Sequence, residues 1–96
     1  MDATNAQVHK VEHHSRYELV MDDKVVGVAD YRLDDEVVVF PHTEIAPPMR
    51  GRGLGEMLVR AALDDVRESG RQVVARCWFV REFIDDNPEY ADLHAA

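Results

Sequence analysis

The chain has 96 residues, 46% of them apolar and 31% charged, which is the size and composition of one globular domain. Its 19 acidic and 11 basic side chains give a net charge of -8, which argues against a nucleic-acid-binding protein because such proteins depend on a basic face. No apolar run is long enough for a transmembrane helix, and residues 1–7 lack the basic-then-apolar pattern of a signal peptide. We therefore expect a single domain over residues 1–96, disordered at residues 1–7, located in the cytoplasm and without membrane contact.

Three β-strands are predicted in the first half of the chain, at residues 16–21, 25–33 and 36–45. Apolar side chains alternate along the first strand, and the other two are rich in β-branched residues. Short acidic turns at residues 22–24 and 34–35 separate them, and such turns join antiparallel neighbours. Residues 8–15 are ambiguous and could add a ragged edge strand.

The second half of the chain changes to helical spacing after the proline pair at 47–48, which ends the third strand because proline donates no backbone hydrogen bond. Apolar residues recur at i, i+3 and i+4 from Leu54 onward, and Gly70 is a suitable C-cap. Residues 72–75 predict a fourth strand and residues 78–84 a second helix. The predicted fold is α+β: a three-stranded antiparallel meander, then a helix, a fourth strand parallel to the third, and a C-terminal helix.

A glycine-rich loop precedes the first predicted helix. It consists of Arg50, Gly51, Arg52, Gly53, Leu54 and Gly55. A helix N-terminus offers free N–H groups and the positive end of a dipole, and glycine lets an anion approach the backbone, so the loop predicts a phosphate site. It lacks the Lys-Ser/Thr ending of a nucleotide P-loop, and Glu56 stands where the dinucleotide fingerprint requires a third glycine. The structural alternative is a plain glycine-rich turn in front of an amphipathic helix.

The loop's spacing, between a strand and a long helix, resembles the (Arg/Gln)-x-x-Gly-x-(Gly/Ala) motif of the GNAT acetyltransferase superfamily. The similarity extends over about residues 16–93 to a small single-domain GNAT-like family. Members of that family have a His-Thr pair before the loop, a Cys after the following strand and an Asn-Pro pair that closes the last helix. The corresponding residues of this chain are His42-Thr43, Cys77 and Asn87-Pro88. The resemblance implies a GNAT-like fold and an N-acetyltransferase activity that uses acetyl-CoA.

The resemblance also implies how coenzyme A binds. Backbone N–H groups of residues 50–55 would hold its pyrophosphate, and Arg50 and Arg52 would add positive charge, although either arginine could be exposed without a role. The pantetheine arm would lie between the third and fourth strands, bonded to backbone near Ile45, much as a peptide adds to a sheet edge.

Cys77 and the pair His42 and Glu44 are the candidate catalytic residues. Cys77 lies at the predicted junction of strand and helix, where a thiol can be activated to accept an acetyl group and pass it on. The alternative is a small buried apolar residue, which is the commonest cysteine environment. His42 and Glu44 share a strand face, so either could be a base or orient the acceptor, or both could be a solvated polar pair.

Other residues carry weaker expectations. The tyrosine that serves as the acid in many larger GNATs cannot be assigned here. Trp78 and Phe79 are most simply core residues. A metal site is not expected, because the chain has one cysteine and the adjacent His13 and His14 would point to opposite faces of a strand.

Two functions therefore follow from the sequence. The first is an acetyl-CoA-dependent N-acetyltransferase whose acceptor is an unidentified amine, either a small molecule or a protein lysine. The second is a non-catalytic acyl-CoA-binding or protein-interaction module, since the helices that build the acceptor site of larger GNATs are missing. The oligomeric state is open, with a monomer as the default.

Overall fold

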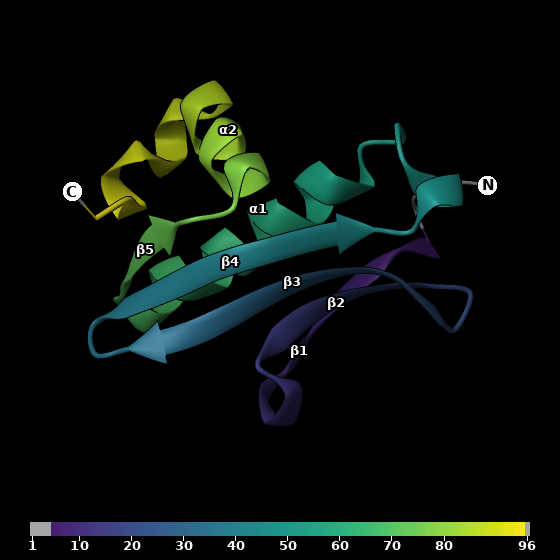
Figure 1. Cartoon of the computed structure of the whole chain (residues 1–96), viewed down its shortest axis with the longest axis horizontal. Coiled ribbons are helices and arrows are strands. Elements are labelled where there is room, and N and C mark those ends of the chain that lie inside the picture. Colours follow the sequence, from purple (N-terminus) through teal and green to yellow (C-terminus); the bar gives the residue numbers. More distant parts are fainter. Residues whose placement is uncertain (1–4, 96) are drawn as a thin grey trace.

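The computed structural model describes residues 5–95, which form a five-stranded sheet with the order β1-β2-β3-β4-β5 (Figure 1). The strands are β1 (Gln7–Val11), β2 (Arg16–Met21), β3 (Lys24–Asp34), β4 (Val37–Ile45) and β5 (Gln72–Ala75). The first four are antiparallel, and β5 runs parallel to β4. The α+β class and the parallel last strand are confirmed, whereas the antiparallel meander has four strands instead of three.

The additional strand is β1, which the sequence left ambiguous. It pairs with β2 from Gln7↔Val20 to Val11↔Arg16. It lies at the edge of the sheet and is mostly exposed, so its side chains show no clean apolar alternation. Gln7 thus belongs to a strand and not to the segment expected to be disordered at residues 1–7, of which residues 1–4 lie outside the described residues.

Acidic residues make the tight turns of the meander, as expected. Asp22 and Asp23 connect the paired residues Met21 and Lys24 and have φ values of 50° and 64°. A two-residue turn with both φ values positive matches the twist of a hairpin, and aspartate tolerates this backbone region better than most residues.

Helix α1 (Leu54–Ser69) lies across one face of the sheet, and α2 (Trp78–Asp86) follows β5 (Figure 1). The buried side of α1 consists of Leu54, Gly55, Leu58, Val59, Ala62, Leu63 and Val66. It packs on the core residues of β2, β3 and β4, and the helix ends at Gly70 as predicted. In the described part of the chain, no helix is both long and apolar enough to cross a bilayer.

The C-terminal segment is fixed to α1 by polar contacts. The Tyr90 hydroxyl donates to Asp64 at 2.6 Å, and Arg60 donates to that hydroxyl at 3.2 Å and to Asn87 at 3.1 Å. Burial and the hydrogen bond to Asp64 raise the pKa of the Tyr90 phenol above its ordinary value. These contacts hold the end of α2 in place, so its first residues can form one wall of a site.

Candidate functional site

The strands β4 and β5 separate at the centre of the molecule. Their pairing ends at Phe40↔Ala75, while β4 continues to Ile45 (Figure 1). The Phe40 carbonyl accepts N–H groups from both Arg76 and Cys77, at 3.2 and 2.9 Å, which turns the chain away from β4 and into α2. The last residues of β4 therefore have β3 on one side and no strand of the described chain on the other.

The free edge of β4 presents unpaired backbone groups. The Ala46 N–H donates to Val26 at 2.8 Å, which continues the β3–β4 ladder past its last paired residues. Hydrogen-bonded and non-hydrogen-bonded pairs alternate in an antiparallel ladder, so Thr43 and Ile45 direct their N–H and C=O groups away from β3. The Arg50 Nε–H donates to the Ile45 carbonyl at 3.0 Å, which is consistent with this direction.

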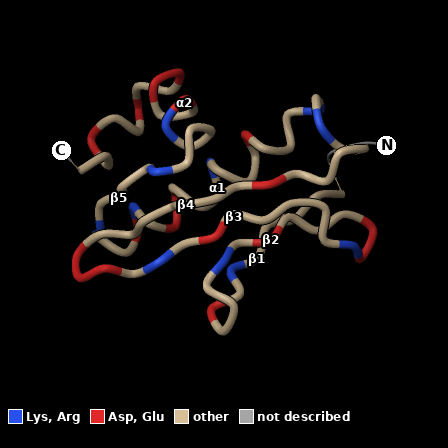
Figure 2. Tube along the Cα trace, viewed as in Figure 1, with Lys and Arg blue, Asp and Glu red and all other residues tan. Residues whose placement is uncertain are grey.

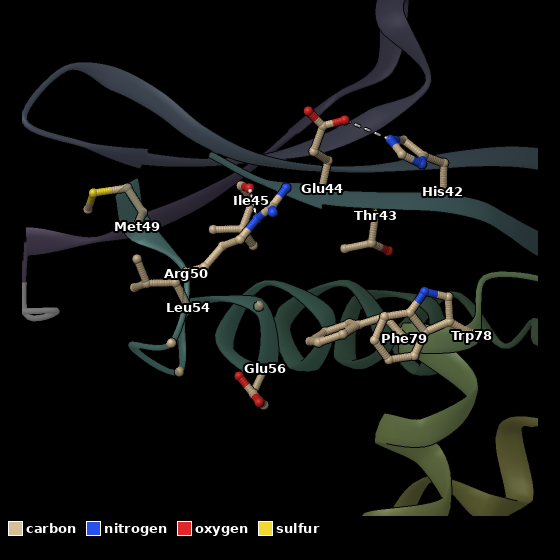
Figure 3. A pocket seen from close by; sticks show the side chains of 13 residues that line it. His42, Thr43, Glu44, Ile45, Met49, Arg50, Leu54, Glu56, Trp78 and Phe79 are labelled. Atoms are coloured by element: carbon tan, nitrogen blue, oxygen red, sulfur yellow. Dashed lines mark hydrogen bonds and ion pairs between the residues drawn. The ribbon is translucent and has the colours of Figure 1, made fainter. Parts of the chain in front are cut away.

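A cleft of about 820 Å³ opens beside this edge (Figure 3). One wall comes from β4, the second from the glycine loop and the start of α1, and the third from the start of α2. Its lining consists of His42, Thr43, Glu44, Ile45, Met49, Arg50, Gly51, Gly53, Leu54, Gly55, Glu56, Trp78 and Phe79. The predicted loop and strand residues thus meet in one cleft, except Arg52, which is not part of its lining.

The glycine loop presents an open surface to the cleft. Gly51 and Gly53 have φ values of 77° and 76°, a region that favours glycine, and no atom lies within 4 Å of a Cβ built at either position. Gly53 is the N-cap of α1 and provides no side-chain hydrogen bond, so the N–H groups of residues 54–56 have no partner within the helix. Figure 2 shows basic residues in this loop of an otherwise acidic chain. Free N–H groups, a helix dipole and arginine charge are suited to an anion.

Trp78 and Phe79 form the opposite wall. Their rings pack edge-to-face with centroids 5.8 Å apart, and Trp78 is 70% exposed, so the expectation of a core tryptophan was wrong. Phe79 is partly buried against Gly55, where a Cβ would lie only 2.6 Å from the ring. A glycine at position 55 therefore lets the phenylalanine ring approach α1.

His42 and Glu44 lie together on the sheet face that points away from α1 (Figure 3). Their side chains are 53% and 58% exposed, and His42 Nε2 lies 3.1 Å from a carboxylate oxygen of Glu44. An ionised carboxylate only accepts hydrogen bonds, so Nε2 carries the proton and donates it to Glu44. In the neutral imidazole, Nδ1 is then the free proton acceptor.

Cys77 occupies the expected junction of strand and helix, but it is buried. It is the N-cap residue of α2, and its side chain belongs to the hydrophobic core with 8% of the residue exposed. Among residues 5–95, those that line the cleft do not include Cys77. Its role as a nucleophile stays a prediction.

Thr43 is a site residue to which the sequence assigned no role. Its hydroxyl oxygen is buried and has no hydrogen-bond partner within residues 5–95, although the residue lines the cleft. The side chain points away from His42 and Glu44, toward the wall formed by Trp78 and Phe79 (Figure 3). A buried hydroxyl without a partner is unfavourable, so this position suits a polar ligand. Period-two alternation with Ile45 is the sequence signal that could have identified it.

Comparisons with known proteins identify a family to which this chain is similar. A family model for GCN5-related N-acetyltransferases matches residues 16–93. Protein NATD1 of Bos taurus is 35% identical over 66 residues, which are 69% of this chain and 58% of that protein. Protein NATD1 of Homo sapiens is 33% identical over 66 residues, which are 69% of this chain and 58% of that protein. The matched region thus spans under two thirds of these relatives.

Solved structures share the fold at low sequence identity. A GCN5-like protein of Staphylococcus aureus, solved by NMR, superposes with a TM-score of 0.74 at 20% identity, covering 97% of this chain and 91% of that one. N-acetylglutamate synthase from Neisseria gonorrhoeae, solved with coenzyme A and N-acetylglutamate, gives a TM-score of 0.59 at 20% identity, covering 75% of this chain and 19% of that one. With a family match across nearly the whole described sheet and both helices, this chain belongs to the GCN5-related N-acetyltransferase family.

Proposed function

We propose that this protein binds acetyl-CoA in the cleft and transfers the acetyl group to a primary amine. The observation that carries the proposal is the meeting of two features in one cleft: the unpaired edge of β4 and the uncapped N-terminus of α1. The first accepts a peptide-like chain and the second accepts phosphate. Coenzyme A contains both groups.

In this proposal the glycine loop holds the pyrophosphate. The N–H groups that follow Gly53 and the positive-φ turns at Gly51 and Gly53 supply donors, and Arg50 and Arg52 supply charge. The amides of the pantetheine arm add to the free edge of β4 at Thr43 and Ile45, as an extra strand would. The unpartnered Thr43 hydroxyl gains a polar neighbour there.

Acetyl-CoA supplies an acetyl group activated as a thioester. The acceptor nitrogen attacks the thioester carbonyl carbon, the C–S bond breaks, and the nitrogen loses a proton. In this proposal His42 takes that proton at Nδ1, and the hydrogen bond from Nε2 to a Glu44 carboxylate oxygen 3.1 Å away orients the imidazole. The departing thiolate then takes a proton back from the imidazolium, so the proton count balances without a separate acid. Tyr90 does not serve here, since Asp64 and Arg60 hold its hydroxyl against α1.

The cysteine relay is the alternative route within the same function. In that route, the Cys77 thiolate attacks the thioester, CoA leaves, and the amine takes the acetyl group from sulfur. Its burial in the core disfavours this route, whereas its place at the N-terminus of α2 favours it. The variant Cys77→Ala separates the two, because direct transfer survives it and the relay does not.

The function is tested by thiol release from acetyl-CoA in the presence of primary amines. The assay uses a lysine peptide and a polyamine as acceptors, with His42→Asn as the variant and His94→Asn, an exposed residue outside the cleft lining, as a matched control. Amine-dependent release that falls in His42→Asn and persists in the control supports the proposal. Tight binding of acetyl-CoA without release would instead favour a non-catalytic acyl-CoA-binding module. The acceptor, the monomeric state and the cytoplasmic location stay predictions.

A further inference from the structure

Arg50 occupies the cleft at the point where a ligand strand would bind. Its Nε–H donates to the Ile45 carbonyl at 3.0 Å, and its side chain lines the cleft (Figure 3). The Arg50 side chain is thus directed toward Ile45 at the end of β4 (Figure 3). This hydrogen bond satisfies the carbonyl that the free edge of β4 directs into the cleft.

A pantetheine arm and Arg50 compete for this position. If an amide N–H of the arm is to bond to the Ile45 carbonyl as an added strand, it must approach from the same open side of β4. The Ile45 carbonyl already accepts the Arg50 Nε–H on this open side, so an amide of the arm and the guanidinium approach the same oxygen from the cleft. The side chain of Arg50 must therefore leave before the arm can bind.

Phosphate provides the reason for Arg50 to leave. The residue directly precedes Gly51, so the guanidinium can turn from Ile45 toward an anion in the glycine loop while its backbone stays in place. Arginine binds phosphate through charge-assisted and often bidentate hydrogen bonds between opposite charges, whereas the bond to the Ile45 carbonyl joins the cation to a neutral acceptor through one N–H. The exchange is favourable when a phosphate is present and unfavourable when it is absent.

We infer that Arg50 is a specificity-determining residue that makes binding of the pantetheine arm depend on a phosphate bound in the glycine loop. The inference rests on the proposed function, because it assumes that the cleft binds coenzyme A. Arg50 then excludes pantetheine compounds without a phosphate and couples the two halves of the cleft.

The test compares pantetheine and coenzyme A in the wild type, Arg50→Ala and the control Arg52→Ala, by NMR-detected titration. Arg52 lies two residues further along the same loop, is exposed, and makes no side-chain hydrogen bond or ion pair with the described residues. Loss of the Arg50–Ile45 hydrogen bond should tighten pantetheine binding about 3- to 10-fold. Arg52→Ala should weaken coenzyme A binding and leave pantetheine binding unchanged.

A second arm uses inorganic pyrophosphate as a separate ligand. In the wild type, saturating pyrophosphate should tighten pantetheine binding by a similar factor, and in Arg50→Ala this coupling should vanish. Unchanged or weaker pantetheine binding by Arg50→Ala, or pyrophosphate that leaves wild-type binding unchanged, overturns the inference while the proposed function stands. Failure of the wild type to bind coenzyme A overturns the proposed function and the inference with it.

Discussion

Replacing Gly55 with alanine tests how the cleft is built. The new Cβ would lie 2.6 Å from the tip of the Phe79 ring and 3.1 Å from a second ring carbon. Carbon atoms pack best at about 3.5–4.0 Å, so the ring must move by about 1 Å. Because Phe79 is partly exposed and packs edge-to-face on the exposed Trp78, we expect the ring to move and the backbone of α1 to stay.

Two opposing effects determine the stability of this variant. Crowding a packed site costs about 1–3 kcal/mol, and replacing glycine by alanine within a helix contributes about 0.5–1 kcal/mol in the other direction. With a movable ring on one side, the cost lies at the low end, so the free energy of unfolding should change by less than about 1 kcal/mol. Acetyl-CoA affinity should fall about tenfold, because the displaced ring narrows the cleft where the pantetheine arm would bind.

The assay is calorimetric titration of acetyl-CoA together with chemical denaturation. In a Phe79→Ala background the same glycine substitution should have no effect on affinity, because the clashing ring is gone. Gly70→Ala is the control: its φ of 77° makes alanine strained and no atom lies within 4 Å of the added Cβ, so it should lose stability and keep affinity. A Gly55→Ala protein that is about 1 kcal/mol more stable with unchanged affinity would refute the account of this wall.

Three further predictions concern catalysis and stability. His42→Asn should lower the rate of acetyl transfer about 10²- to 10⁴-fold in steady-state assays, with acetyl-CoA affinity unchanged. Glu44→Gln should cause a smaller loss, because it weakens the hydrogen bond that orients the imidazole. Equal rates in the wild type and both variants would exclude a catalytic role for His42 and Glu44. Tyr90→Phe should cost about 0.5–1.5 kcal/mol of unfolding free energy in urea denaturation, because Asp64 loses a donor. Since the folded-state pKa of Tyr90 is raised, this contribution is complete below the ordinary pKa of about 10 and declines as pH rises through the folded value, so the difference between wild type and variant should shrink there. Leu58→Ala removes a side chain with 0% exposure and should cost about 2–5 kcal/mol by the same measurement, and a loss below that range would argue against its core position.

Local patterns were enough to predict the parts of the site that depend on short stretches of chain. The helical spacing after the loop and the cap at Gly70 depend on stretches of one or two helical turns, and both are confirmed. The phosphate site inferred from the loop glycines stays a prediction. The shared face of His42 and Glu44 follows from strand geometry alone. Parallel pairing of β5 follows from the helical crossover between β4 and β5, which returns the chain to the same end of the sheet.

The remaining features depend on contacts between distant segments. Trp78 is a large apolar residue of the kind usually found in a core, and only the position of α2 beside the cleft explains its exposure. The Arg50–Ile45 hydrogen bond arises because β5 ends before β4 does, which no local pattern records. Strand β1 is stabilised by its neighbour β2, so its own sequence carries little signal. Burial of Cys77 was one of two alternatives that the sequence left open, and it results from the packing of α2 on the sheet.

Titration of ¹⁵N-labelled protein with coenzyme A tests the central claim most directly. The account predicts that the largest amide shifts occur at Thr43 and Ile45, on the free edge of β4, and at residues 50–56 of the loop and first helical turn. The chemical shifts of amides in β1 and in the C-terminal segment, which lie away from the cleft, should not change. Binding that shifts other amides and leaves β4 and the loop unchanged, or no binding at all, would contradict the account.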